Sequence, residues 1–102
     1  MTFKLGELIY SNAGRDAGRR FIITNIIDEE YVLISDGDLR KIEKPKKKKI
    51  KHIKACGIII DSLNKKLENK DKMTDAEIRK AIAQLVQSIE SHKENKEGWN
   101  FV

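Results

Sequence analysis

The sequence predicts an α+β fold: a small β-barrel followed by a C-terminal helical hairpin. Short segments rich in β-branched and aromatic residues alternate with Gly and Asp turns through the first half of the chain, and a lysine run closes that half. The second half changes to apolar residues at helical spacing. Because the composition shifts after Lys54, we expect a barrel over residues 1–54 and a helical hairpin with a tail over residues 55–102.

Turn-forming residues divide the first half into segments of strand length. A glycine-punctuated loop covers residues 11–18, an acidic turn covers 28–30, and Asp36-Gly37-Asp38 is a hairpin signal because Gly and Asp tolerate positive φ. Pro45 cannot donate to a ladder, so it ends a strand or lies at an edge. The expected strands are residues 7–11, 19–27, 31–35 and 39–43, with a last charged strand or extended segment from Lys46.

The second half predicts two helices joined by a polar turn. Apolar spacing predicts a short helix from Ile58 to about Asn69, although Ile58-Ile59-Ile60 would also suit a strand. Thr74 and Glu77 have the spacing of a capping box, which predicts a second helix over about residues 74–93.

The second helix carries one apolar stripe that must pack on something. Intramolecular packing is favoured over a partner groove, because the helix needs a face to bury and the barrel needs cover. Gly98 is expected to stop the helix, and Trp99 and Phe101 are expected either to dock or to meet a partner. The stripe consists of Ile78, Ile82, Leu85 and Ile89.

Size and composition exclude several classes of protein. A chain of 102 residues with 39% hydrophobic and 36% charged residues can bury only a thin core. The single Cys56 forms no internal disulfide, and neither a signal peptide nor an apolar stretch of about 20 residues is apparent, so we expect a cytoplasmic protein. No nucleophile–base set, nucleotide-binding loop or metal-ligand spacing is present, so we expect no enzyme, no cofactor and no metal.

The loop before the second strand places an arginine between two glycines. Gly14 and Gly18 allow positive φ or a close approach to a ligand, while Arg15 can reach a phosphate or stack on a base. Asp16 would cap a turn amide or orient an arginine. The simpler interpretation is two turn glycines and a solvated Arg15. Arg19 and Arg20 point to opposite faces of a strand, so only one of them is expected to face a ligand bound at this loop.

Basic residues dominate the segment from Arg40 to Lys54, where Glu43 is the only acidic residue. One or two lysines would suffice to protect a strand edge from aggregation, but four in succession repel one another unless a polyanion neutralises them. We therefore expect contacts to phosphates, with strong salt dependence. The candidate RNA-binding residues are Arg15, Arg19, Arg20, Arg40, Lys41, Lys44, Lys46, Lys47, Lys48, Lys49, Lys51, His52 and Lys54.

The order of these features resembles a known family. Gly6, Leu8-Ile9, Gly14, Arg15-Asp16 and Gly18, with the apolar strand that follows, resemble the KOW motif of small SH3-like barrels. Together with the segments YVLISDG and RKIEKPKKKK, they resemble bacterial members of a group of KOW-domain RNA-binding proteins. That group is akin to the eukaryotic and archaeal type of large-subunit ribosomal protein (fourteen-e, six-e and twenty-seven-e). The match covers about residues 5–55, and it implies an SH3-like KOW barrel.

The residues and the resemblance together predict non-catalytic binding of structured RNA, with ribosomal RNA or the ribosome as the favoured partner. The main alternative is a protein-interaction module that contacts ribosomal or transcription-elongation proteins through the helical hairpin and the C-terminal aromatics. Binding to anionic lipid is a weaker alternative, since no apolar anchor adjoins the lysines, so we expect no membrane partner.

Overall fold

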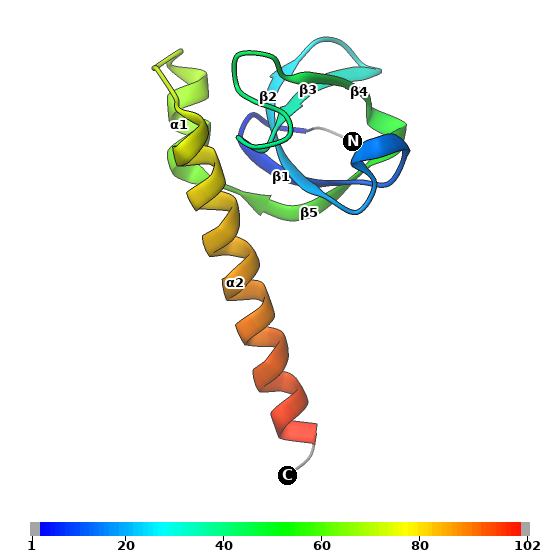
Figure 1. The fold of residues 1–102 in the computed structure, drawn as a ribbon, viewed down its shortest axis with the longest axis vertical. Helices are drawn as coiled ribbons and strands as arrows, with labels where there is room; N and C mark the ends of the chain where they lie inside the picture. The colour runs from blue at the N-terminus through cyan, green and yellow to red at the C-terminus, as the bar shows by residue number, and fades with distance from the viewer. Residues whose placement is uncertain (1–2, 101–102) are drawn as a thin grey trace.

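A curled antiparallel sheet and a pair of helices make up the chain (Figure 1). The computed structural model describes the backbone of residues 3–100 and the side chains of residues 3–88. The strands follow the order β4-β3-β2-β1-β5 across the sheet. In chain order the elements are β1 (Glu7–Ser11), the 3-10 turn η1 (Gly14–Asp16), β2 (Arg20–Ile26), β3 (Tyr31–Ser35), β4 (Lys46–Lys49), the 3-10 turn η2 (Ile50–His52), β5 (Ile53–Ile59), α1 (Asp61–Glu68) and α2 (Asp75–Asn100).

The α+β prediction is confirmed, whereas the barrel prediction is confirmed only in outline. Register shifts between Glu7 and Ile9 on β1 and between Ile23 and Asn25 on β2 allow the sheet to bend. Within the described residues no ladder joins β4 to β5, so the sheet curls broadly like an SH3 barrel without closing. β5 continues past residue 54 and pairs with β1 as far as Ile59.

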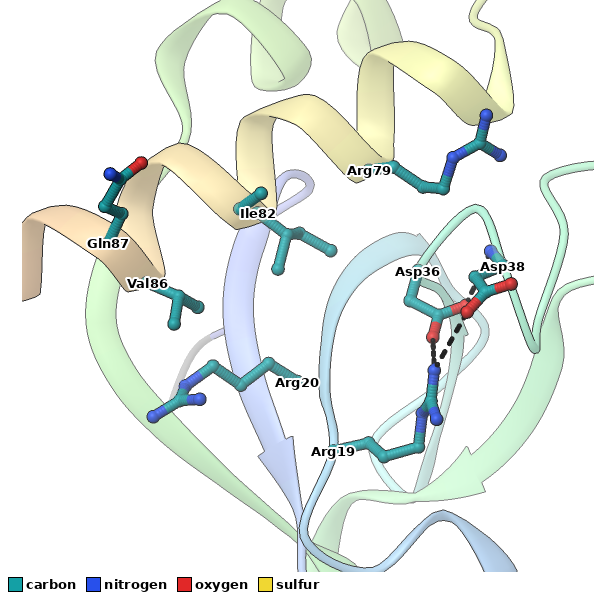
Figure 2. Close-up of a pocket in the computed structure, with 9 residues that line it drawn as sticks. Arg19, Arg20, Asp36, Asp38, Arg79, Ile82, Val86 and Gln87 are labelled. Carbon is teal, nitrogen blue, oxygen red and sulfur yellow. Dashed lines mark hydrogen bonds and ion pairs between the residues drawn. The ribbon is translucent and has the colours of Figure 1, made fainter. Parts of the chain in front are cut away.

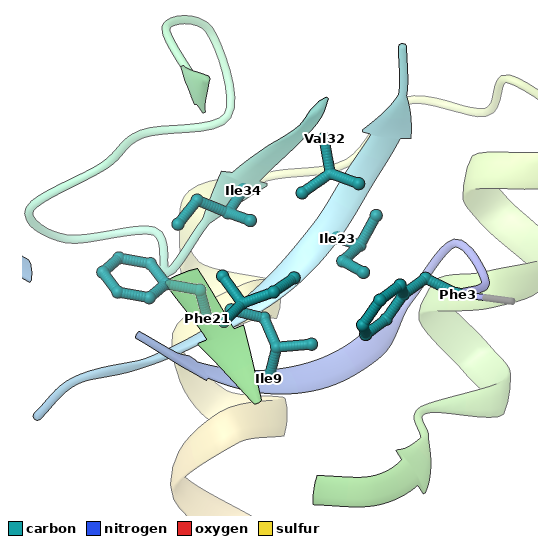
Figure 3. Close-up of a cluster of buried hydrophobic side chains, with 7 residues drawn as sticks. Phe3, Ile9, Phe21, Ile23, Val32 and Ile34 are labelled. Carbon is teal, nitrogen blue, oxygen red and sulfur yellow. The ribbon is translucent and has the colours of Figure 1, made fainter. Parts of the chain in front are cut away.

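Both faces of the sheet are buried, as the apolar character of β2 predicts. Alternate residues of β1 and β2 point to opposite faces. Ile9, Phe21 and Ile23 lie on the concave face and pack with Phe3, Val32, Ile34 and Ile53 (Figure 3). Leu8 and Ile22 lie on the other face, which the helices cover.

The helical hairpin packs its predicted stripe against that second face. Ile78 is fully buried, and Ile82 and Leu85 are half-buried against the cluster of Leu8 and Ile22. Intramolecular packing of the stripe is therefore confirmed as far as Leu85. Ile89, Trp99 and Phe101 lie outside the side chains that the structure describes.

Three predicted elements differ from the structure. Residues 39–43 form a loop instead of a strand, because Asp36 Oδ1 accepts hydrogen bonds from the amides of Asp38 and Arg40 and holds the backbone in a turn. Ile58 and Ile59 continue β5, so α1 begins only at Asp61. Gly98 does not stop α2, which runs to Asn100, consistent with the modest cost of a single glycine inside a helix.

The predicted capping box is confirmed at the start of α2. The Glu77 amide donates to Thr74 Oγ1 at 3.2 Å, and the Thr74 amide donates to Glu77 Oε2 at 3.0 Å. Lys66 of α1 also donates to the Glu77 carboxylate and joins the two helices. The hydrogen bond from Lys66, and then that from Thr74, lowers the pKa of Glu77 below its ordinary value.

This lowered pKa predicts a loss of stability in acid. A depressed carboxylate pKa contributes stability that is complete above the unfolded-state value and is lost as the pH falls through the folded-state value. We expect Glu77→Gln to lower the urea midpoint at about pH 6, with a difference from wild type that shrinks steadily below about pH 4.5. Glu68→Gln is the matched control at an exposed helical position and should not reproduce this pattern. If the difference in urea midpoint between Glu77→Gln and wild type were unchanged at low pH, this would contradict a lowered pKa of Glu77 in the folded state.

Candidate nucleic-acid interface

The loop between β1 and β2 presents Arg15 on a rigid turn. Gly14 and Gly18 have φ values of +74° and +86°, which confirms them as turn glycines. The amide of Ala17 donates to the carbonyl of Gly14 and that of Gly18 to the carbonyl of Ser11, so the loop satisfies its own backbone. Arg15, within η1, is exposed to solvent. The loop thus offers an unburied guanidinium from a well-defined backbone.

Asp16, beside Arg15, is buried and holds two cations. Its carboxylate is 1% exposed. It accepts hydrogen bonds from Arg40 Nε at 3.2 Å and Arg40 Nη2 at 3.3 Å, and Lys48 Nζ lies 3.5 Å from Asp16 Oδ2. Of the two roles considered for Asp16, the structure shows the orientation of an arginine. The carboxylate ties the η1 loop to the β3–β4 loop and to β4.

Lys48 differs from the other three lysines of β4. It pairs in register with Val32, whose side chain lies in the concave core, and its own side chain is only 9% exposed. Its ammonium donates to the carbonyl of Ala13 at 2.9 Å and faces Asp16. Lys48 was expected to bind RNA with its neighbours, but in this structure its charge is used within the fold.

The other lysines of β4 are exposed along the edge of the sheet. The ammonium groups of Lys47 and Lys49 lie 4.4 and 5.9 Å from the centre of the Tyr31 ring, close enough for a cation–π interaction. Lys46 lies on the opposite face of the strand from Lys47 and Lys49. The strand therefore directs positive charge to both sides of one sheet edge.

The turn η2 continues this edge toward the η1 loop. The amide of Asn12, at the start of that loop, donates to the carbonyl of His52 at 3.0 Å. Lys51 is exposed and His52 is half-buried. Residues far apart in the sequence thus lie along one edge of the fold, with side chains on both sides of it, which we call the basic edge. It consists of Arg15, Lys46, Lys47, Lys49, Lys51 and His52.

The remaining candidates lie beside this edge or away from it. Lys41 and Lys44 are exposed on the β3–β4 loop, next to the Arg40 that Asp16 holds. Arg20 and Lys54 both pair in register with Tyr10, so they lie on the face of the sheet that the helices cover.

Arg19 is engaged with two carboxylates. Its Nη2 lies 2.9 Å from Asp36 Oδ2 and 3.4 Å from Asp38 Oδ2 (Figure 2). The hydrogen bond to Asp36 raises the pKa of Arg19. Much of its charge is therefore balanced locally, in contrast to that of Arg15.

Sequence reasoning missed how the β3–β4 loop is held. Asp75 Oδ1 accepts a hydrogen bond from the amide of Ile42 at 2.8 Å, and Arg79 Nη1 donates to the carbonyl of Gly37 at 2.6 Å. Asp75 lies between Thr74 and Glu77 of the predicted capping box. Its place in the first turn of α2 carried no signal that it bonds a residue 33 positions earlier.

Within residues 3–88 no group of three or more His, Cys, Asp or Glu side chains is arranged to hold a metal ion. Neither described helix combines the length and hydropathy of a membrane-spanning segment.

Comparisons with known proteins point to one group of relatives. The chain is 32% identical over 80 residues to large ribosomal subunit protein eL14 of Staphylothermus marinus, covering 78% of this chain and 76% of the relative. The proteins of the same name from Pyrobaculum arsenaticum and Desulfurococcus amylolyticus are each 31% identical, over 78 and 81 residues, covering 76% and 79% of this chain and 69% and 77% of the relatives. No family model matches the chain. These relatives are archaeal, and a bacterial origin for this chain stays a prediction.

The buried position of Asp16 predicts a large effect of its replacement. Asp16→Asn leaves the Lys48 ammonium buried without an anionic partner, and breaking a buried pair from one side costs about 3–5 kcal/mol. We expect the free energy of unfolding in urea to fall by about 3 kcal/mol. Asp38→Asn removes an exposed partner of Arg19 and is the control, with an expected cost of about 0–1 kcal/mol. Equal losses for the two variants would rule out a special role for Asp16.

Proposed function

Because the chain belongs to the family of large ribosomal subunit protein eL14, we propose that it binds ribosomal RNA as a non-catalytic component of the large subunit. It would do so in the cytoplasm, without a cofactor. Each relative compared above is named as a ribosomal protein. Of the three ribosomal protein groups that the sequence resembles (fourteen-e, six-e and twenty-seven-e), the relatives belong to the first.

The observation that carries this proposal is the basic edge. Arg15, Lys46, Lys47 and Lys49 are exposed and lie in segments that Asp16 and Lys48 hold together. The described residues show no ion pair between these four side chains and a carboxylate. Clustered, uncompensated cations on a rigid support are suited to a polyphosphate backbone, since binding releases the counterions of the RNA.

The cations have different tasks in this proposal. Exposed lysines act as point charges that add affinity to any phosphate, whereas the planar guanidinium of Arg15 gives a directional, bidentate contact. Lys41 and Lys44 extend the edge along the β3–β4 loop, and Arg40 holds that loop through its bonds to Asp16. Lys48 contributes by holding the η1 loop, since its ammonium is bound to Ala13 and Asp16 within the fold.

Salt titration tests this proposal. We expect the triple variant Lys46→Gln, Lys47→Gln, Lys49→Gln to bind folded large-subunit rRNA fragments more weakly than wild type. Each lost phosphate contact lowers the slope of log K against log salt by about 0.7–0.9, so the slope should fall by about 2–3. Lys48 is left in place so that the fold is kept.

The matched control removes three exposed lysines from the helical half. The triple variant Lys65→Gln, Lys72→Gln, Lys80→Gln has the same net charge as the edge variant. It should keep the wild-type slope if binding depends on the basic edge. Equal effects of the two triple variants would show that only net charge matters, and the proposed interface would be abandoned.

A further inference from the structure

A groove runs between α2 and the sheet, on the side of Arg19 and Arg20 (Figure 2). Its volume is about 460 Å³. Ile82 and Val86 of α2 form one apolar wall, and Asp38 lies at the other side beside Arg19. The basic edge contributes none of the residues that line it.

The groove is rigidly built. Arg79 donates to the carbonyl of Gly37, and Asp75 accepts from the amide of Ile42, so α2 clamps the loop that carries Asp38. On the apolar side, Ile82 packs against the core cluster of Leu8 and Ile22. A groove whose walls are held in this way binds without paying for much rearrangement.

Both signs of charge line the groove. Within the described side chains Arg20 has no carboxylate at ion-pair distance. Asp38 keeps 73% of its side chain exposed, although it lies 3.4 Å from Arg19. Arg20 lies toward Val86 and Gln87, and Asp38 lies at the far side of the groove (Figure 2).

This chemistry suits a protein segment better than RNA. Asp36 is paired with Arg19, but the exposed carboxylate of Asp38 would repel a phosphate, and the lining includes no aromatic ring on which a base could stack. An apolar wall with separated positive and negative groups matches a peptide surface with the opposite arrangement of charge. We propose that the groove docks a segment of a partner protein that places an apolar side chain on Ile82 and Val86 and a carboxylate on Arg20.

The backbone of α2 extends beyond the groove, away from the basic edge. α2 continues to Asn100 and projects past the sheet in Figure 1. In the same view β4 forms an edge of the sheet away from α2, so RNA on the basic edge and a protein in the groove can be bound together.

The test begins by identifying what contacts the groove. Val86 is replaced by the photoreactive amino acid p-benzoylphenylalanine in the full chain, which is cross-linked in nuclease-treated extract of its own cells. Gln84, which faces the space between α1 and α2, carries the same group in the control. We expect the probe at position 86 to cross-link to a protein segment that carries an acidic residue near an apolar one. The probe at position 84 should not cross-link to this segment. Cross-linking to nucleotides, to a second copy of the chain, or equally from both positions would overturn the proposal.

A charge swap then tests the predicted contact. The segment is synthesised, and we expect Arg20→Glu to weaken its binding by about 10-fold or more, while Lys65→Glu, a matched reversal on α1, leaves it unchanged. Replacing the acidic residue of the peptide by Arg should restore binding to the Arg20→Glu chain. Arg20→Gln is the second variant if the reversal impairs folding, as monitored by circular dichroism. The proposal would be contradicted if the folded Arg20 variants bound the original peptide as tightly as wild type does. It would also be contradicted if the peptide with Arg in place of its acidic residue failed to bind the Arg20→Glu chain.

Discussion

The buried carboxylate of Asp16 is the interaction on which the basic surface depends. A carboxylate that is 1% exposed needs cationic or hydrogen-bonding partners, and Arg40 and Lys48 supply them from two other segments. One buried anion thus anchors the η1 loop, the β3–β4 loop and β4. Without it, the local density of positive charge would favour separation of these segments.

The same arrangement connects the two halves of the chain. Asp16 holds the β3–β4 loop through Arg40, and Asp75 holds the same loop two residues further along through the amide of Ile42. The loop lies between the basic edge and the start of α2. The helices therefore cover the second face of the sheet and also fix one border of the surface proposed to bind RNA.

Local patterns in the sequence predicted the features that depend on neighbouring residues. The capping box of Thr74 and Glu77, the turn glycines 14 and 18, and the stripe from Ile78 to Leu85 all follow from spacing along the chain. The strand expected at residues 39–43 failed because β propensity there competes with the side chain of Asp36, which bonds the turn amides. Likewise, the run of four lysines does not show that Lys48 alone points inward, since this depends on its register with Val32. Tertiary contacts therefore decide which basic side chains pair within the fold and which stay exposed on the surface.

The most direct test is a structure of the large ribosomal subunit with this chain bound. We expect Arg15, Lys46, Lys47 and Lys49 to lie within hydrogen-bonding distance of RNA phosphates, while Lys48 keeps its hydrogen bond to Ala13 and its ion pair with Asp16. A structure in which Lys48 leaves Asp16 to contact RNA, or in which the basic edge faces solvent, would contradict it.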